Sequence, residues 1–93
     1  MTKPLQYPFP KAPGDVLDYS YDFTEFLNGA TPTNPEVTCV SGGLEVSDVQ
    51  LNGNAVSCIV SGGSIGRAVL EFTVDFDGGR QVVRQAILNV RDR

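Results

Sequence analysis

Residues 61–90 read SGGSIGRAVLEFTVDFDGGRQVVRQAILNV, which is two alternating apolar patterns joined by a glycine-containing turn. In the first pattern every second residue is apolar: Ala68, Leu70, Phe72, Val74 and Phe76. Such an alternation predicts a β-strand with one buried face. Asp77-Gly78-Gly79 supplies residues that tolerate the positive φ of a tight turn. Beyond it the core-facing positions are Val82, Ala86, Leu88 and Val90, with Arg84 as the one polar member. The stretch therefore predicts a long antiparallel hairpin.

Upstream of this hairpin the chain alternates between short strand patterns and turn residues. The expected strands cover residues 16–21, 36–40, 44–51 and 55–60, and the third of them has a bulge near Ser47-Asp48. One helical turn, which Asp22 caps and Asn28-Gly29 ends, follows the first strand, and a loop over 31–35 leads to the second. Turns at 41–43 and 52–54 connect the remaining strands. The expected core face of the strand over 55–60 is Val56, Cys58 and Val60. Turn signals at this spacing are typical of an immunoglobulin-like β-sandwich. The sequence thus predicts an all-β fold.

Residues 1–14 differ in composition from the rest of the chain. They contain four of the six prolines, which favour extended or polyproline II backbone over helix. Large apolar side chains also occur there at alternate positions, and we expect an extended arm that docks on its own domain or on a neighbour. The candidate partner-binding residues are Leu5, Tyr7, Pro8, Phe9 and Pro10. The expected organisation is an arm over 1–14 and an immunoglobulin-like sandwich over 15–93.

Length and charge limit the classes of function. The chain has 93 residues and a net charge of −4, which predicts one domain and argues against nucleic acid as the main partner. From residue 12 to residue 66 there are seven acidic residues and no basic ones, whereas residues 80–93 contain four arginines. We interpret these arginines as solvated charges on a terminal strand. There is no membrane-spanning apolar run and no signal-peptide pattern, so folding in a cytoplasm is expected.

The residues that commonly carry enzyme chemistry do not form a known arrangement here. Histidine is absent, which removes the usual Ser-His-Asp and Cys-His catalytic groups. Two cysteines, Cys39 and Cys58, are too few for a structural zinc site. A disulfide between them is geometrically possible if their strands face each other across a sandwich, but without a secretory signal we favour reduced, buried thiols. Residues 62–67 lack the Gly-Lys-Ser/Thr ending of a phosphate-binding loop. The sequence predicts neither catalysis nor a metal or cofactor.

Several short motifs occur in an order that resembles a family of small immunoglobulin-like virion proteins of tailed phages, the fiber-tail adaptors. The matching residues are Leu17-Asp18-Tyr19, Asp22-Phe23, Ser61-Gly62-Gly63, Gly66, Gly79-Arg80 and Leu88-Asn89-Val90-Arg91. The resemblance extends over nearly all of the chain from Pro13 onward. The chain departs from the family pattern in having Phe23 where tryptophan is common, and Ala68 or Val69 where an aromatic residue follows Gly66.

The resemblance implies a non-enzymatic structural protein that joins tail or neck to fibers through protein–protein contacts. Its expected partners are other virion proteins, within a homo-oligomer or symmetric ring, with neither nucleic acid nor membrane, and its expected location is the virion. Two alternatives share the fold class: a capsid decoration protein, and a module that binds carbohydrate or a cell surface. Within the adaptor hypothesis, residues 1–14 would clasp a neighbouring subunit while the sandwich presents the interface to the fiber or neck.

Overall fold

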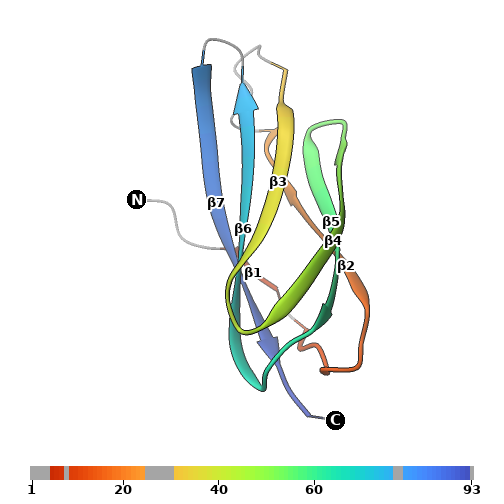
Figure 1. The fold of residues 1–93 in the computed structure, drawn as a ribbon. Helices are drawn as coiled ribbons and strands as arrows, with labels where there is room; N and C mark the ends of the chain where they lie inside the picture. The colour runs from red at the N-terminus through yellow and green to blue at the C-terminus, as the bar shows by residue number, and fades with distance from the viewer. Residues whose placement is uncertain (1–4, 8, 25–30, 77–78, 93) are drawn as a thin grey trace.

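The computed structural model describes residues 5–7, 9–24, 31–76 and 79–92. Over these ranges the chain forms seven strands (Figure 1), which are β1 (Leu5–Gln6), β2 (Leu17–Asp22), β3 (Thr33–Ser41), β4 (Leu44–Asn52), β5 (Ala55–Gly62), β6 (Gly66–Phe76) and β7 (Arg80–Val90). No helix in the described part of the chain is long and apolar enough to cross a membrane. The all-β prediction is confirmed.

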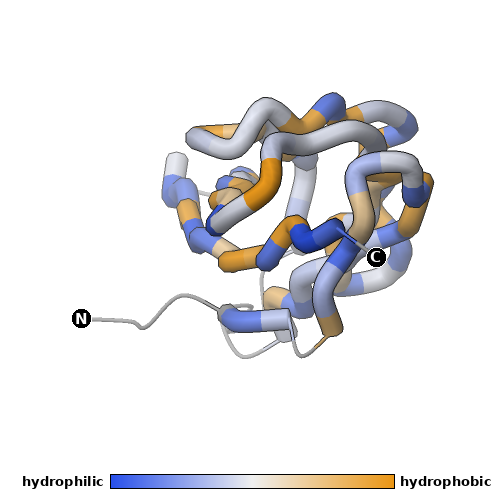
Figure 2. Tube along the Cα trace, turned by 90° about the horizontal axis from the view of Figure 1, so that it is seen from below, coloured by the Kyte–Doolittle hydropathy of each residue, from blue (hydrophilic) through white to orange (hydrophobic). Residues whose placement is uncertain are grey.

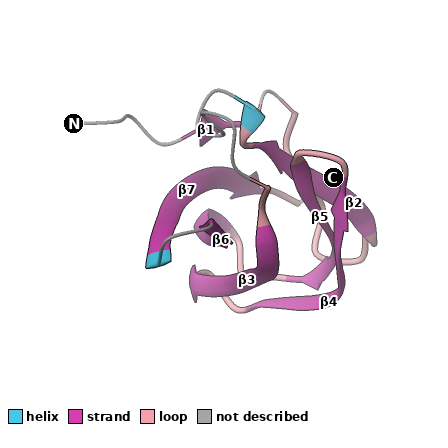
Figure 3. Cartoon of the chain, turned by 90° about the horizontal axis from the view of Figure 1, so that it is seen from above, coloured by secondary structure: helices cyan, strands magenta, loops and turns pink. Residues whose placement is uncertain are grey.

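The strands are arranged in two packed sheets. One sheet has the order β1-β7-β6-β3 and the other has the order β2-β5-β4. All neighbouring pairs are antiparallel except β1 and β7, which run parallel. Viewed from above, the two sheets lie as separate layers (Figure 3). The result is a sandwich-like fold.

The core lies between the layers and consists of the side chains that the alternation assigned to it. Ala68, Leu70, Phe72 and Val74 of β6 are fully buried, and Phe76 is 4% exposed. Opposite them lie Val56, Cys58 and Val60 of β5, as predicted. Phe23 is also fully buried, so the aromatic residue of the Asp22-Phe23 motif is a core residue. Along the strands the trace changes repeatedly between hydrophobic and hydrophilic residues (Figure 2), which is the pattern of strands buried on one face.

The predicted hairpin of β6 and β7 is confirmed. Its register runs without interruption from Gly66↔Val90 to Phe76↔Arg80. Ala86, Leu88 and Val90 are buried, Val82 packs against the core, and Arg84 is half-buried at the same face. Asp77 and Gly78 of the predicted turn lie outside the described residues. Gly79 has the positive φ, +80°, that the turn prediction required.

The irregularities predicted in β4 are also confirmed. The pairing with β5 shifts between Ser47 and Gln50, and Asp48 has a φ of +52°. This bulge keeps Val46, Val49 and Leu51 in contact with the core although they are not all an even number of residues apart. Asn52 pairs with Ala55, which confirms the tight turn between β4 and β5.

Two predicted strand starts need correction, and the observed strands also end one or two residues later than predicted. Residues 33–35 belong to β3 and not to a loop, because Thr33 pairs with Asp75 before the register shifts. Asn34 has a φ of +51° at this irregularity, and Pro35 is tolerated there because a bulge interrupts the hydrogen-bond ladder. The first long strand spans 17–22 and not 16–21. The predicted helical turn falls largely outside the described residues, although the Asp22 side chain does accept hydrogen bonds from the backbone N–H and the hydroxyl of Thr24.

Candidate partner-binding surface

The N-terminal segment is anchored along one edge of its own sandwich. Leu5 and Gln6 pair in parallel with Ala86 and Ile87 of β7. The backbone N–H of Tyr7 then donates to the Ile87 carbonyl over 3.0 Å, and that of Lys11 donates to the Asn89 carbonyl over 2.9 Å. The chain thus lies beside β7 at residues 5–7 and again at Lys11, as the position of β1 beside β7 illustrates (Figure 1).

Tyr7 connects this segment to the second sheet. Its hydroxyl donates to the Ser20 carbonyl of β2 over 3.1 Å, and its ring lies against Tyr19 with 4.6 Å between the centroids. Burial, followed by nearby Cys58 and tyrosine groups, raises the pKa of Tyr7 well above its ordinary value. The pKa of Tyr19 is also raised, mainly by burial and secondarily by Asp15 and Asp18. Both rings therefore stay neutral at physiological pH.

Lys11 is the one charged side chain found fully buried among the described residues. Its ammonium group donates to the Gly62 carbonyl over 2.6 Å and to the Ala12 carbonyl over 2.8 Å, with a longer contact of 3.5 Å to the Pro13 carbonyl. These bonds tie the N-terminal segment to the end of β5. The sequence pattern did not indicate this role, because a lysine in a proline-rich segment is expected to be solvated.

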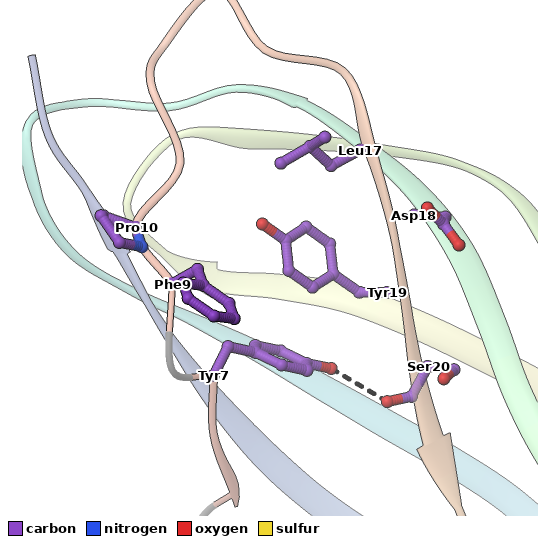
Figure 4. Close-up of a pocket in the computed structure, with 7 residues that line it drawn as sticks. All are labelled: Tyr7, Phe9, Pro10, Leu17, Asp18, Tyr19 and Ser20. Atoms are coloured by element: carbon purple, nitrogen blue, oxygen red, sulfur yellow. Dashed lines mark hydrogen bonds between the residues drawn. The ribbon is translucent and has the colours of Figure 1, made fainter. Parts of the chain in front are cut away.

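An open groove lies between the N-terminal segment and β2 (Figure 4). It has a volume of about 380 Å³ and is lined by Tyr7, Phe9, Pro10, Leu17, Asp18, Tyr19 and Ser20. Phe9 is 79% exposed and Leu17 is 38% exposed, so two apolar side chains at this groove face solvent. Asp18 is the acidic residue of the lining. The groove offers aromatic and aliphatic surface rather than a set of reactive groups.

The structure brings together three of the five residues predicted to bind a partner. Tyr7, Phe9 and Pro10 all line the groove, whereas the backbone of Leu5 pairs with β7 and Pro8 lies outside the described residues. The sequence prediction missed Leu17 and Tyr19, which form the opposite wall. A signal for them existed, since Leu17, Tyr19 and Tyr21 alternate along one strand, but the sequence did not indicate that β2 would lie beside residues 7–10.

The other candidates for chemistry are the two cysteines. Cys39 and Cys58 are free thiols, and burial raises the pKa of Cys58 to about 11. The Cys39 thiol donates to the Ser41 carbonyl over 3.2 Å. Across the described ranges, no group of three or more histidine, cysteine, aspartate or glutamate residues is placed to hold a metal ion. Among the described residues, the groove is the candidate binding surface.

An open apolar groove on a small all-β sandwich is a surface of the kind that proteins use to contact other proteins. Residues 11–89 match the family model described as podophage GP4 fiber-tail adaptor protein gp77, and the chain belongs to this family. A comparison with curated proteins found no match. The protein is a non-enzymatic structural component of the phage tail, located in the virion, and it links the tail to its fibers. The resemblance seen in the sequence is confirmed.

Proposed function

We propose that copies of this adaptor associate as a symmetric oligomer in the tail. In this arrangement residues 1–14 act as the arm that contacts the neighbouring copy, and the sandwich of residues 15–93 carries the fiber or tail partner. The binding residues on the arm are Tyr7, Phe9 and Pro10, together with Leu5 and Pro8. Contacts repeated around a ring add through multivalency, so each one can be modest.

The observation that carries this proposal is the exposure of Phe9. Burial of a phenylalanine side chain contributes roughly 1.5–3 kcal/mol, so a ring that is 79% exposed forgoes most of that stabilisation in the isolated chain. The adjoining groove walls from Leu17 and Tyr19 offer further apolar surface at the same place. A neighbouring copy that covers Phe9 and the groove would recover this free energy.

We infer that the sandwich has immunoglobulin-like topology. The orders β7-β6-β3 and β2-β5-β4 correspond to the G-F-C and B-E-D strands of that fold. In the same correspondence β1, parallel to β7, occupies the position of a first strand transferred to the sheet of the last one. This supports an arm that is fixed to its own domain at β1 and Lys11 and faces outward at Phe9.

The test replaces Phe9 with aspartate and measures the oligomeric state by sedimentation velocity and the incorporation of the protein into virions. We expect Phe9→Asp to shift the protein towards the monomer and to reduce incorporation at least tenfold. The melting temperature should change little, because Phe9 contributes little to the core of the isolated chain.

Ile65→Asp is the matched control, since Ile65 is an apolar residue that is 61% exposed on the connection between β5 and β6. It should assemble normally. If Phe9→Asp leaves both oligomeric state and incorporation unchanged, the arm is not the contact between copies.

A further inference from the structure

A ring of identical copies needs two different contact surfaces on each copy, because every copy meets one neighbour on each side. The groove between the N-terminal segment and β2 supplies one of them. It lies at the edge of the sandwich that β1 and β2 form, whereas β3 and β4 form the opposite edge (Figure 3). The more copies a ring contains, the closer its two surfaces come to opposite sides of the copy. The second surface is therefore expected at β3 or β4.

Exposed apolar side chains narrow its position. Away from the groove, and from Val16 next to it in the chain, the large apolar side chains most exposed in the described ranges are Val40, Ile65 and Val83. Ile65 lies on the connection between β5 and β6, and Val83 lies in β7, the strand beside β1. Val40, which is 53% exposed, lies in β3 and therefore at the edge opposite the groove.

The local backbone explains why Val40 faces solvent. The pairing of β3 with β6 passes from Cys39↔Leu70 to Ser41↔Val69, so Val40 is an extra residue in the strand. Cys39 packs against the core, whereas Val40 is directed outward. An extra residue also interrupts the hydrogen-bond ladder of the edge strand. A contact at this place is therefore expected between side chains and not by addition of a strand.

The groove carries an acidic side chain that a cation on the second surface would complement. Asp18 is exposed and lines the groove. On the same side of the molecule, Lys11 is fully buried with its ammonium group bonded to carbonyls. Arg91 is exposed beyond β7 but does not line the groove. An apolar side chain with a neighbouring cation is thus the surface that fits.

Arg67 of β6 supplies this cation beside Val40. It is exposed, and its carbonyl would lie 3.5 Å from a Cβ placed on Gly42, two residues after Val40. The nearby carboxylates on β3 and β6 are those of Glu36, which pairs with Thr73, and Glu71, which pairs with Thr38. Along the sheet, both lie on the other side of Val40 from Arg67.

Two of the remaining carboxylate relations can be assigned. Glu71 accepts a hydrogen bond from the Gln85 amide over 3.3 Å. Glu45 belongs to β4 in the second sheet, where the neighbouring Leu44 faces the core, so its carboxylate points to that sheet's outer side. Arg67 makes no ion pair with these three carboxylates within the described ranges. It is therefore available to an acidic group of another copy.

We propose that Val40 and Arg67 form the second contact surface between copies, on which Phe9 of the neighbouring copy packs against Val40 while its Asp18 meets Arg67. The assignment rests on the proposed function, in which the arm contacts the next copy. Because the two surfaces differ, the contact is head-to-tail and repeats around the ring. Each junction can be small, since the closed ring adds them together.

The test mixes two variants that are each defective on one surface. Phe9→Asp keeps the Val40 surface, and Val40→Asp keeps the groove. Each variant alone is expected to sediment as a monomer, whereas an equimolar mixture should form heterodimers through its one intact pair of surfaces and nothing larger. Val83→Asp is the matched control, because it places the same charge at another exposed valine of the same sheet. It should assemble like the wild type.

An exchange of charges tests the polar half of the contact. Arg67→Asp should weaken self-association and reduce incorporation into virions by about threefold or more, because it places like charges together. Addition of Asp18→Arg in the same chain should restore both to within roughly twofold of the wild type. Incorporation into virions gives the same comparison if the isolated copies do not associate.

The outcomes that overturn the proposal differ from those that overturn the role of the arm. A Val40→Asp protein that assembles normally, beside a monomeric Phe9→Asp protein, would place the second surface elsewhere and leave the arm as a contact. Monomeric variants that form no heterodimer would show that Phe9 and Val40 do not meet. A double exchange that fails to restore assembly would remove the contact between Asp18 and Arg67. Normal assembly of Phe9→Asp would refute the arm itself.

Discussion

At the scale of single residues, the fold leaves no room for a side chain at Gly42. This residue lies where the chain leaves β3 in one sheet and enters β4 in the other. Its φ is +102°, and a Cβ placed on it would lie 2.4 Å from the Cβ and 2.7 Å from the Cα of Ala68. The Gly42 carbonyl also accepts a hydrogen bond from the Ser64 N–H over 2.8 Å. The crossing between the sheets therefore requires both an unusual backbone conformation and the absence of a side chain.

Gly42→Ala should lower the free energy of unfolding by about 2–5 kcal/mol, since about 1–2 kcal/mol arises from the positive φ and about 1–3 kcal/mol from forced contact with a buried strand. Urea denaturation measures the difference. Gly53→Ala is the matched control, because Gly53 has a φ of +61° but a Cβ added to it would meet no atom within 4 Å. It should cost only about 1–2 kcal/mol. Equal losses of stability in the two variants would show that the close approach of residue 42 to Ala68 adds nothing to the cost of the substitution.

At the scale of the elements, the N-terminal segment behaves as part of the sandwich up to Lys11. β1 extends one sheet, Tyr7 reaches the other, and the Lys11 ammonium group is held by carbonyls at the end of β5. The Arg91 N–H also donates to the Lys11 carbonyl over 2.9 Å, so the N-terminal segment is held to the chain just beyond β7. Among the described residues of this segment, Phe9 projects into solvent. In the proposed arrangement, one segment can therefore both stabilise its own domain and contact a neighbour.

Lys11→Met should reduce the free energy of unfolding by about 1–3 kcal/mol, because it leaves the Gly62 and Ala12 carbonyls without their charged donor. Arg91→Met is the control: Arg91 is exposed, and its loss should change stability by less than about 0.5 kcal/mol. Chemical denaturation at neutral pH compares the two. A Lys11→Met protein as stable as the wild type would mean that methionine packing compensates fully for the lost hydrogen bonds.

At the scale of the whole molecule, three distant parts of the chain place groups with raised pKa values together. Tyr7 comes from the N-terminal segment, Tyr19 from β2 and Cys58 from β5, and Tyr19 pairs directly with Cys58. Burial is the main cause of the raised pKa in all three groups. A folded-state pKa above the unfolded value means that the native protein retains a proton that the unfolded chain has lost. Stability is therefore full below the unfolded pKa and falls as the pH rises.

For Cys58 the pKa rises from 9.0 to about 11 on folding, so its contribution to stability is lost between about pH 9 and pH 11. Between pH 8 and pH 10.5 we expect Cys58 to contribute a loss of up to about 2 kcal/mol in the free energy of unfolding. Urea denaturation under reducing conditions at several pH values measures this slope. The free energy of unfolding of Cys58→Ala should fall less steeply with pH than that of the wild type, whatever the stability of the variant at pH 8. Tyr7 and Tyr19 should account for the pH dependence that remains. An identical slope in wild type and variant would assign the effect to other groups.

Much of the fold could be predicted because local residue patterns specify it. Period-two alternation identified the core side of β5, β6 and β7, and the break in the alternation at Ser47-Asp48 identified the bulge. The strand start at Thr33 was missed because Pro35 reads as a loop residue, and only pairing with Asp75 allows it to lie in a strand. For the candidate site, alternate apolar residues at 5, 7 and 9 indicated a docking segment, but not which of its residues would be covered by the chain itself.

The sequence by itself determined the all-β class, the position of the central hairpin, most core residues and, through motif order, the adaptor family. These properties depend on neighbouring residues or on short motifs, so they can be read along the chain. Only the tertiary structure decided that Tyr7 and Lys11 are anchored inside, and that Phe9 faces Leu17 and Tyr19 across a groove. Each of these depends on contacts between segments far apart in the chain, and their free energy comes from burial and pairing that no local pattern contains.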